Sequence, residues 1–311
     1  MGVFVFLPLV LPLTAWPIAR LAEHHLHPRA ATRLLSAASA VLGVCSTLCL
    51  ALLAIVGTAQ LPGNPLPDGW SDAEVRAAVP HHELVGKAAI GALALVAVAC
   101  TTLLLHHQRV RRRAERALRG LPATRVAVLR DPTPFAHALP GGRGAGRILV
   151  STGMLAGLGS RERRALFAHE RAHLDGRHHR FLVVAGLAAR ANPFLRPLRT
   201  SVAYTVERWA DEEAARAVGD RRVTARAVGK AALISPGPPA STLAAFAAPG
   251  PVPRRVAALL GPAPVARTWP PTFTAVGAAA WSAVAGTALS AMSSANSAVT
   301  MIVILRTATP L

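Results

Sequence analysis

Long runs of apolar residues dominate the two ends of this sequence. They cover Gly2 to Ile18, Leu34 to Thr58, Lys87 to Leu105 and about Phe273 to Leu305. Each run comes near the roughly 20 residues that a helix needs to cross the hydrocarbon of a bilayer. The pattern predicts a mainly α membrane protein with about four transmembrane helices. The first is the least regular, because it contains Pro8, Pro12 and Pro17.

The chain between the third and fourth runs has a different pattern, with short apolar segments set among polar residues. We therefore divide the chain into three transmembrane helices over residues 1–105, one domain outside the bilayer over 106–272, and a fourth helix with a short tail over 273–311. Ser160 to Leu174 has the period of a helix, with Ser160 as its N-cap. Phe181 to Ala191 is apolar but too short to span, so we expect it to lie against the membrane or the domain core.

Basic residues predict the orientation of these helices. Arg20, Arg29 and Arg33 follow the first run, and residues 109–119 after the third run are rich in arginine, whereas residues 59–86 carry four acidic residues and a single arginine. Short loops rich in Lys and Arg stay on the cytoplasmic side of a membrane. We expect a multi-pass protein of the cell membrane with its N-terminus outside and residues 106–272 in the cytoplasm.

Composition supports a membrane protein and argues against a nucleic-acid partner. The chain is 52% apolar and only 16% charged, against about 25% charged in soluble domains. Its formal net charge is +19, but the arginines gather beside apolar runs and do not alternate with aromatic residues, which favours membrane lipid as the partner. Cys45, Cys49 and Cys100 lie inside apolar runs, where we expect them to pack as small hydrophobic residues.

One motif between the spans carries recognisable chemistry. His169-Glu170-Arg171-Ala172-His173 places two histidines four residues apart. On a helix both imidazoles then project from one face and can bind one Zn²⁺, while Glu170 lies beside a water on the metal. The sequence thus predicts His169 and His173 as zinc ligands and Glu170 as the general base. The alternative is a pair of ordinary surface histidines.

A catalytic zinc needs a third protein ligand, and Glu207 is the candidate. It lies in a predicted helix over Tyr204 to Ala214, with Asp211 one turn later. Asp211 can accept a hydrogen bond from the distal nitrogen of a ligand histidine and fix its tautomer. The alternative is an acidic, solvated helix face, but the histidine motif favours a metal site.

The motif His169 to His173, followed by Asn192-Pro193 and by Glu207-Arg208-Trp209-Ala210-Asp211, resembles peptidase family M56, whose members are membrane metallopeptidases of the gluzincin type. The resemblance implies a cytoplasmic α+β zinc-peptidase domain. It also implies cleavage of a protein or peptide substrate in the cytoplasm, such as a transcriptional repressor.

The resemblance extends upstream to a hairpin before the zinc helix. Residues 135–142 and Arg147 to Ser151 resemble the hairpin of gluzincin membrane proteases. In those enzymes an extended peptide adds to the edge strand. The residues expected to contact substrate are Ala136, His137, Ala138 and Leu139, and the alternative is a purely structural hairpin.

Other residues leave alternatives open. Tyr204, three residues before Glu207, is a candidate for oxyanion stabilisation, although packing between helices is the favoured interpretation. His106, His107, His178 and His179 are interpreted as basic residues of the membrane interface and not as metal ligands. The rival functions are a quality-control protease similar to the HtpX type, and a catalytically silent adaptor that keeps a structural metal.

Overall fold

The computed structural model describes residues 6–77, 79, 81–117, 124–141, 146–235, 252–264 and 274–307. The long helices are α2 (Ala15–His25), α3 (Pro28–Thr58), α5 (His82–Ala117), α7 (Ser160–Asp175), α8 (His178–Ala191), α9 (Arg196–Val218), α10 (Arg221–Ile234) and α12 (Ala275–Thr307). The short ones are α1 (Leu7–Val10), α4 (Ala73–Ala77), α6 (Thr152–Gly157), α11 (Val252–Leu260) and the 3₁₀ turns η2 (Leu11–Thr14), η3 (Asp68–Ser71) and η4 (Pro193–Leu195). The strands are β1 (Val126–Leu129), β2 (Ala136–Leu139) and β3 (Arg147–Ser151).

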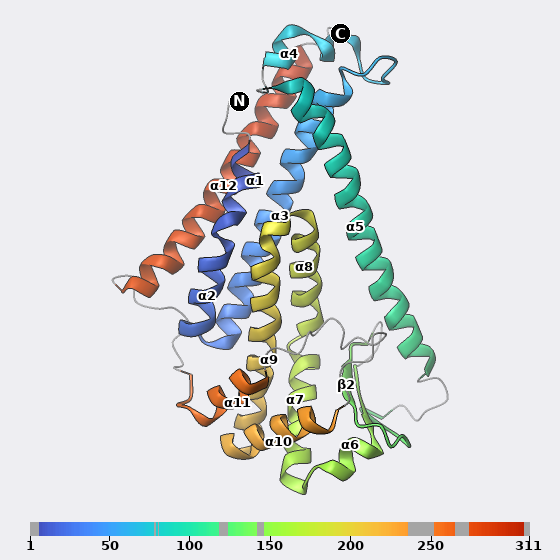
Figure 1. The fold of residues 1–311 in the computed structure, drawn as a ribbon, viewed down its shortest axis with the longest axis vertical. Coiled ribbons are helices and arrows are strands. Elements are labelled where there is room, and N and C mark those ends of the chain that lie inside the picture. Colours follow the sequence, from blue (N-terminus) through green and yellow to red (C-terminus); the bar gives the residue numbers. More distant parts are fainter. Residues whose placement is uncertain are drawn as a thin grey trace.

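Among the described residues, three helices are long and apolar enough to cross a membrane. They are Pro28–Thr58, Glu83–Arg116 and Ala280–Thr307, in α3, α5 and α12. In Figure 1, α3 runs through the middle of the molecule, while α5 and α12 lie on its two sides. Large apolar side chains such as Leu95 on α5 and Met292 on α12 are exposed, as expected of helices that face lipid. The second, third and fourth predicted spans therefore exist as helices.

The first predicted span is not one continuous helix, and that prediction is corrected here. The chain from Leu7 to His25 is divided into α1, η2 and α2. Pro8 and Pro12 occupy the first turns of α1 and η2, where a missing N–H costs least, whereas a proline inside a helix removes a hydrogen bond. The hydroxyl of Ser46 on α3 donates to the carbonyl of Pro8 at 2.9 Å.

The helices α8 and α9 form a hairpin that rises beside α3 towards the broken N-terminal helix (Figure 1). Alanines on α8 and Leu198, Val202 and Val206 on α9 pack in one apolar cluster with α2 and α3. At the tip, Asn192 Nδ2 donates to Ser46 Oγ at 3.0 Å and Asn192 Oδ1 accepts from the N–H of Phe194. The segment Phe181 to Ala191 thus packs against the core, as predicted.

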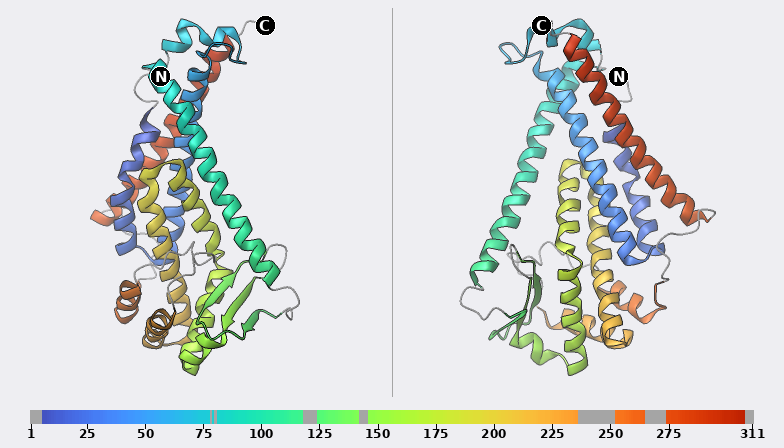
Figure 2. Two further views of the ribbon diagram at one scale, coloured as in Figure 1. Left: turned by 45° about the vertical axis from the view of Figure 1, so that its right-hand side comes forward. Right: turned by 180° about the vertical axis from the view of Figure 1, so that it is seen from behind.

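A close helix crossing joins α3 to α5 at the end remote from the sheet. A methyl group on Gly57 would lie 2.3 Å from the carbonyl carbon of Gly86, so the two backbones touch where side chains are absent. From this crossing α5 diverges from α3 towards its arginine-rich end, and α12 diverges on the other side (Figures 1 and 2). The sheet and α7 lie at the end of the molecule to which α5 leads.

The three strands form one small sheet in the order β1-β3-β2. The β1 strand pairs in parallel with β3, and β2 pairs antiparallel with β3, with Ala138 opposite Ile148. The predicted hairpin over residues 135–151 is confirmed for β2 and β3, while residues 142–145 lie outside the described part. As the outer strand beside β3, β2 has one edge to which no described strand is paired, and β2 contacts α7.

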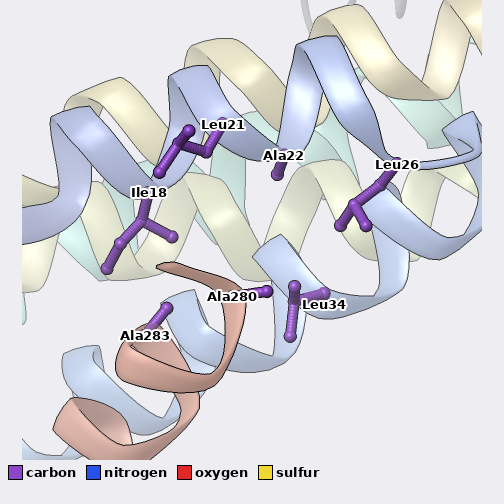
Figure 3. A pocket seen from close by; sticks show the side chains of 7 residues that line it. All are labelled: Ile18, Leu21, Ala22, Leu26, Leu34, Ala280 and Ala283. Carbon is purple, nitrogen blue, oxygen red and sulfur yellow. The ribbon is translucent and has the colours of Figure 1, made fainter. Parts of the chain in front are cut away.

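A pocket lies where the first turns of α12 leave α2 and α3. Its lining includes Ile18, Leu34 and Ala280, and Figure 3 shows that all the labelled side chains around it are hydrocarbon. Such a surface offers no group for acid, base or metal chemistry. The functional site has to be sought elsewhere.

Candidate metal centre

The helix α7 carries the two histidines of the motif. It begins at Ser160, so its N-cap is Gly159 and not Ser160 as predicted. The N–H of Gly159 donates to Glu162 Oε2 at 2.8 Å, and Lys230 on α10 donates to the same carboxylate. These bonds hold the pKa of Glu162 below its usual value. Over the next turns His169 and His173 project towards α9.

The helix α9 brings Glu207 to the two histidines. Its last turn ends at Gly219 in the left-handed region, which glycine adopts without strain. Glu207 is 7% exposed and Asp211 is fully buried, so this part of α9 is not the solvated acidic face that was the alternative interpretation. Burying two carboxylates on one helix is costly unless cations neutralise them. The region therefore needs positive charge.

Three donor groups converge between α7 and α9. The Nε2 atoms of His169 and His173 lie 3.1 Å apart, and they lie 3.4 Å and 3.5 Å from the two carboxylate oxygens of Glu207. In a tetrahedral zinc site with bonds of about 2.0–2.1 Å, the ligand atoms are about 3.3 Å apart. The donor set and its spacing fit zinc. Among the described residues this is the one cluster of histidine, cysteine and acidic side chains that could hold a metal ion.

The far nitrogens of the two imidazoles face partners of different kinds. Nδ1 of His169 lies 3.1 Å from Oδ1 of Asp211, and Nδ1 of His173 lies 2.9 Å from Nδ1 of His178. If both Nδ1 atoms carry the hydrogen, both Nε2 lone pairs point at each other across 3.1 Å. A cation between them would remove that repulsion, and so would a proton on Nε2 of His169.

A buried arginine that belongs to no recognisable motif neutralises part of the acidic charge. Arg255 on α11 donates through Nε and Nη2 to the two oxygens of Asp211, at 2.9 and 2.7 Å, and its Nη1 lies 2.9 Å from Glu207 Oε2. Burial would raise the pKa of Glu207, but Arg255 and the two histidines outweigh it and hold that pKa well below its usual range. The same balance of burial against Arg255 lowers the pKa of Asp211 to about 2.

The two histidines differ in charge preference without a metal. Burial opposes protonation of His169, but Asp211 and Glu207 outweigh it and raise its pKa to about 10. Burial lowers the pKa of His173 to about 4. Without a metal, His169 is therefore protonated and His173 is neutral. A metal ion that binds both imidazoles has to displace the extra proton of His169.

Glu170 lies between the metal cluster and the edge strand. Its carboxyl group is buried, which raises its pKa, and the charge of Glu207 adds to that rise. The backbone N–H of Ala138 on β2 donates to it. Glu170 is therefore close to any substrate that lies along β2, in a position from which it could accept a proton from a water molecule.

The pairing of β2 shows which of its backbone groups are free. The N–H of Ser151 on β3 donates to the carbonyl of Phe135 at 3.0 Å. Since the N–H and C=O of one residue in an antiparallel strand point to the same side and alternate along it, Ala136 and Ala138 present theirs to the open edge, while His137 and Leu139 face β3. Ala136 therefore presents both of its backbone groups to this edge, whereas Ala138 presents its C=O and uses its N–H in the bond to Glu170.

The structure bears on the interpretations of Tyr204 and His178 in different ways. The ring of Tyr204 is buried, and the guanidinium of Arg254 lies 4.3 Å from its centre, which matches the packing alternative and leaves the oxyanion role a prediction. His178 is only 1% exposed, so its interpretation as a membrane-interface residue is wrong. Arg255 was missed because it lies at no regular spacing from the motif, whereas His178 was considered and given the wrong environment.

Comparison with known proteins gives one match. The model of peptidase family M48 matches residues 105–190, a segment that includes His169, Glu170 and His173 but ends before Glu207. Searches of curated proteins and of solved structures found no match. Family M56 is not the family matched, so that finer resemblance is not supported. M48 peptidases are zinc-dependent, and together with the His169, His173 and Glu207 cluster the match supports assigning this chain to the zinc metallopeptidases.

Proposed function

We propose that this chain is an integral-membrane zinc endopeptidase. The observation that carries the proposal is the convergence of His169, His173 and Glu207 at the spacing of zinc donors. The buried carboxyl group of Glu170 interacts electrostatically with His169 and Glu207. Three protein ligands leave a fourth position open, as in catalytic zinc sites, whereas structural sites close with four. The three apolar helices support placement in a membrane.

The residues of the site suit hydrolysis of a peptide bond. Zinc, when bound, supplies the Lewis acid that polarises a carbonyl and makes a water more acidic. Glu170 accepts a proton from the attacking water and later gives a proton to the leaving nitrogen, so that one water is consumed and two chain ends are formed. Burial raises the pKa of this carboxyl group, whereas a bound zinc ion would lower it.

The edge of β2 supports an extended substrate. The N–H and C=O of Ala136 and the C=O of Ala138 can pair with the backbone of an added strand, while the N–H of Ala138 donates to Glu170. Such pairing recognises the backbone of the substrate more than its side chains. The substrate we propose is an unfolded or flexible segment of a protein.

The position of the site supports a substrate on the cytoplasmic side. The sheet and α7 lie towards the arginine-rich end of α5 (Figure 1), and the positive-inside rule puts that end in the cytoplasm. A transcriptional repressor and a damaged membrane protein both offer flexible cytoplasmic segments. We propose the class of substrate only, and both identities remain predictions.

The test pairs zinc content with proteolysis. Wild type and Glu170→Gln are purified in detergent, their zinc is measured, and each is given an unstructured reporter protein. We expect one zinc per chain in both proteins. The rate of cleavage by the variant should be lower than that of the wild type by about 10²- to 10⁴-fold. Zinc without cleavage by the wild type would point to the silent adaptor, and absence of zinc from the wild type would refute the metal site.

A further inference from the structure

We propose that His178 is a positioning residue that fixes the tautomer and orientation of His173. The inference rests on the proposed metal site, but it concerns contacts of the chain alone. Nδ1 of His178 lies 2.9 Å from Nδ1 of His173, the nitrogen that points away from the cluster. His178 is 1% exposed, so no solvent competes for this contact.

A break between α7 and α8 makes the contact possible. In a continuous α-helix, residues five apart point about 140° away from each other, so His178 could not reach His173. Here Arg177 takes the left-handed conformation, with φ of 50°, which restarts the helix in a new direction at His178. A methyl group on Gly176 would lie 2.3 Å from Nε2 of His178, so glycine at 176 leaves room for the ring.

Hydrogen positions in this pair follow from what a metal requires. A ligand nitrogen must present a lone pair, so Nε2 of His173 carries no hydrogen and its Nδ1 does. Nδ1–H of His173 then donates to Nδ1 of His178, which must be an acceptor. The hydrogen of His178 falls on its Nε2, an atom buried without a hydrogen-bond partner among the described residues. A neutral imidazole thus supports His173, whereas a carboxylate supports His169.

Trp209 holds the ring of His178 in place. The two ring centres are 4.5 Å apart, and Trp209 Nε1 donates to Glu213 at 3.2 Å. Arg29 and Arg33 of α3 also place their guanidinium groups 5.4 and 5.8 Å from the centre of the Trp209 ring. Because Trp209 follows Glu207 by two residues, α9 both supplies one proposed ligand and fixes the residue that orients another.

The experiment compares His178→Asn, His178→Gln and His178→Phe in the full chain. The amide of Asn can place its oxygen near the position of Nδ1, whereas that of Gln reaches the position of Nε2 and Phe has no acceptor. Zinc affinity is measured by competition with a chelator, and the absorption spectrum of the Co²⁺-substituted protein reports the ligand geometry. His179→Phe on the same turn is the matched control.

A positioning role and a packing role of His178 predict opposite orders of zinc affinity among the three variants. If His178 positions His173, Gln and Phe weaken zinc binding by about 10- to 100-fold and change the Co²⁺ spectrum, while Asn stays close to wild type. If His178 only fills space, Phe is tolerated best and Asn worst, which would overturn the inference. If His178→Phe fails to fold, the comparison of His178→Asn with His178→Gln still distinguishes the two roles.

The same measurements separate this inference from the proposed function. A wild type that binds zinc but cleaves nothing contradicts the peptidase proposal, yet the order of zinc affinities among the His178 variants still tests the positioning role. A wild type that binds neither zinc nor Co²⁺ contradicts both.

Discussion

Arg255 Nη1 lies 2.9 Å from Oε2 of Glu207, although α10 separates the two helices that carry them in sequence. The same guanidinium is bound through two nitrogens to Asp211. Arg255 therefore compensates two buried carboxylates, with help at Asp211 from the buried Arg208 at 3.8 Å, and the proposed metal shares that task. This relationship couples folding of the site to metal binding.

Replacing Arg255 should make the fold depend on zinc. In Arg255→Gln two carboxylates stay buried without their cation, a loss that costs about 3–5 kcal/mol for a broken buried ion pair. We expect zinc to recover part of that stability, because it restores positive charge. Thermal unfolding in detergent with and without a chelator measures the effect.

The control for this prediction is Arg254→Gln on the same helix, since Arg254 is partly exposed and pairs with Glu23. Its response to the chelator should match that of the wild type. Equal chelator sensitivity in both arginine variants would contradict the assignment.

Glu207 and Asp211 should differ in their effects on zinc. Glu207→Gln removes a proposed ligand and should weaken zinc binding more than Asp211→Asn, for which loss of the contact to His169 predicts about 10- to 100-fold. Chelator competition gives both affinities, with Glu115→Gln on the exposed face of α5 as the control. A larger effect from Asp211 than from Glu207 would mean that the ligand is wrongly assigned.

The edge of β2 can be tested through one backbone group. Ala136→Pro removes an N–H that faces the open edge, where proline is tolerated, whereas Ala136→Ser changes the side chain and keeps the N–H. We expect the proline variant to raise KM for an extended peptide, with zinc content unchanged, and the serine variant to behave as wild type. Equal KM values in all three proteins would remove β2 from the substrate site.

The Glu162 carboxylate should give a stability that depends on pH. Its pKa is lowered in the folded chain from an ordinary value of 4.5, first by the bond from Lys230. The stabilisation is therefore complete above that value and is lost as the pH falls through the lower folded pKa. We expect Glu162→Gln to cost about 1 kcal/mol at pH 7. The difference in unfolding temperature between the variant and the wild type should shrink as the pH falls below 4.5. A gap that persists in acid would assign the effect to packing.

The spans and the metal motif could be predicted from the sequence because they depend on local rules. Apolar length predicts a helix in lipid, and a spacing of four residues puts His169 and His173 on one face of any helix. Glu207 and Asp211 could be selected because they too lie one turn apart. The three prolines marked the first span as irregular, but the division into α1, η2 and α2, and the contact of Ser46 with the Pro8 carbonyl, belong to the tertiary structure.

Arg255 and His178 could be found only in the tertiary structure. Arg255 is one of 34 basic residues, and nothing near it in sequence distinguishes it from Arg254. His178 reaches His173 only because Arg177 breaks the helix at a positive φ. Short-range patterns determine which helices form and which faces they present, whereas the pairing of buried charges depends on which helices meet. The sequence alone thus predicted three of the apolar helices and the candidate metal ligands, and the packing of α8, α9 and α11 decided which side chains contact those ligands.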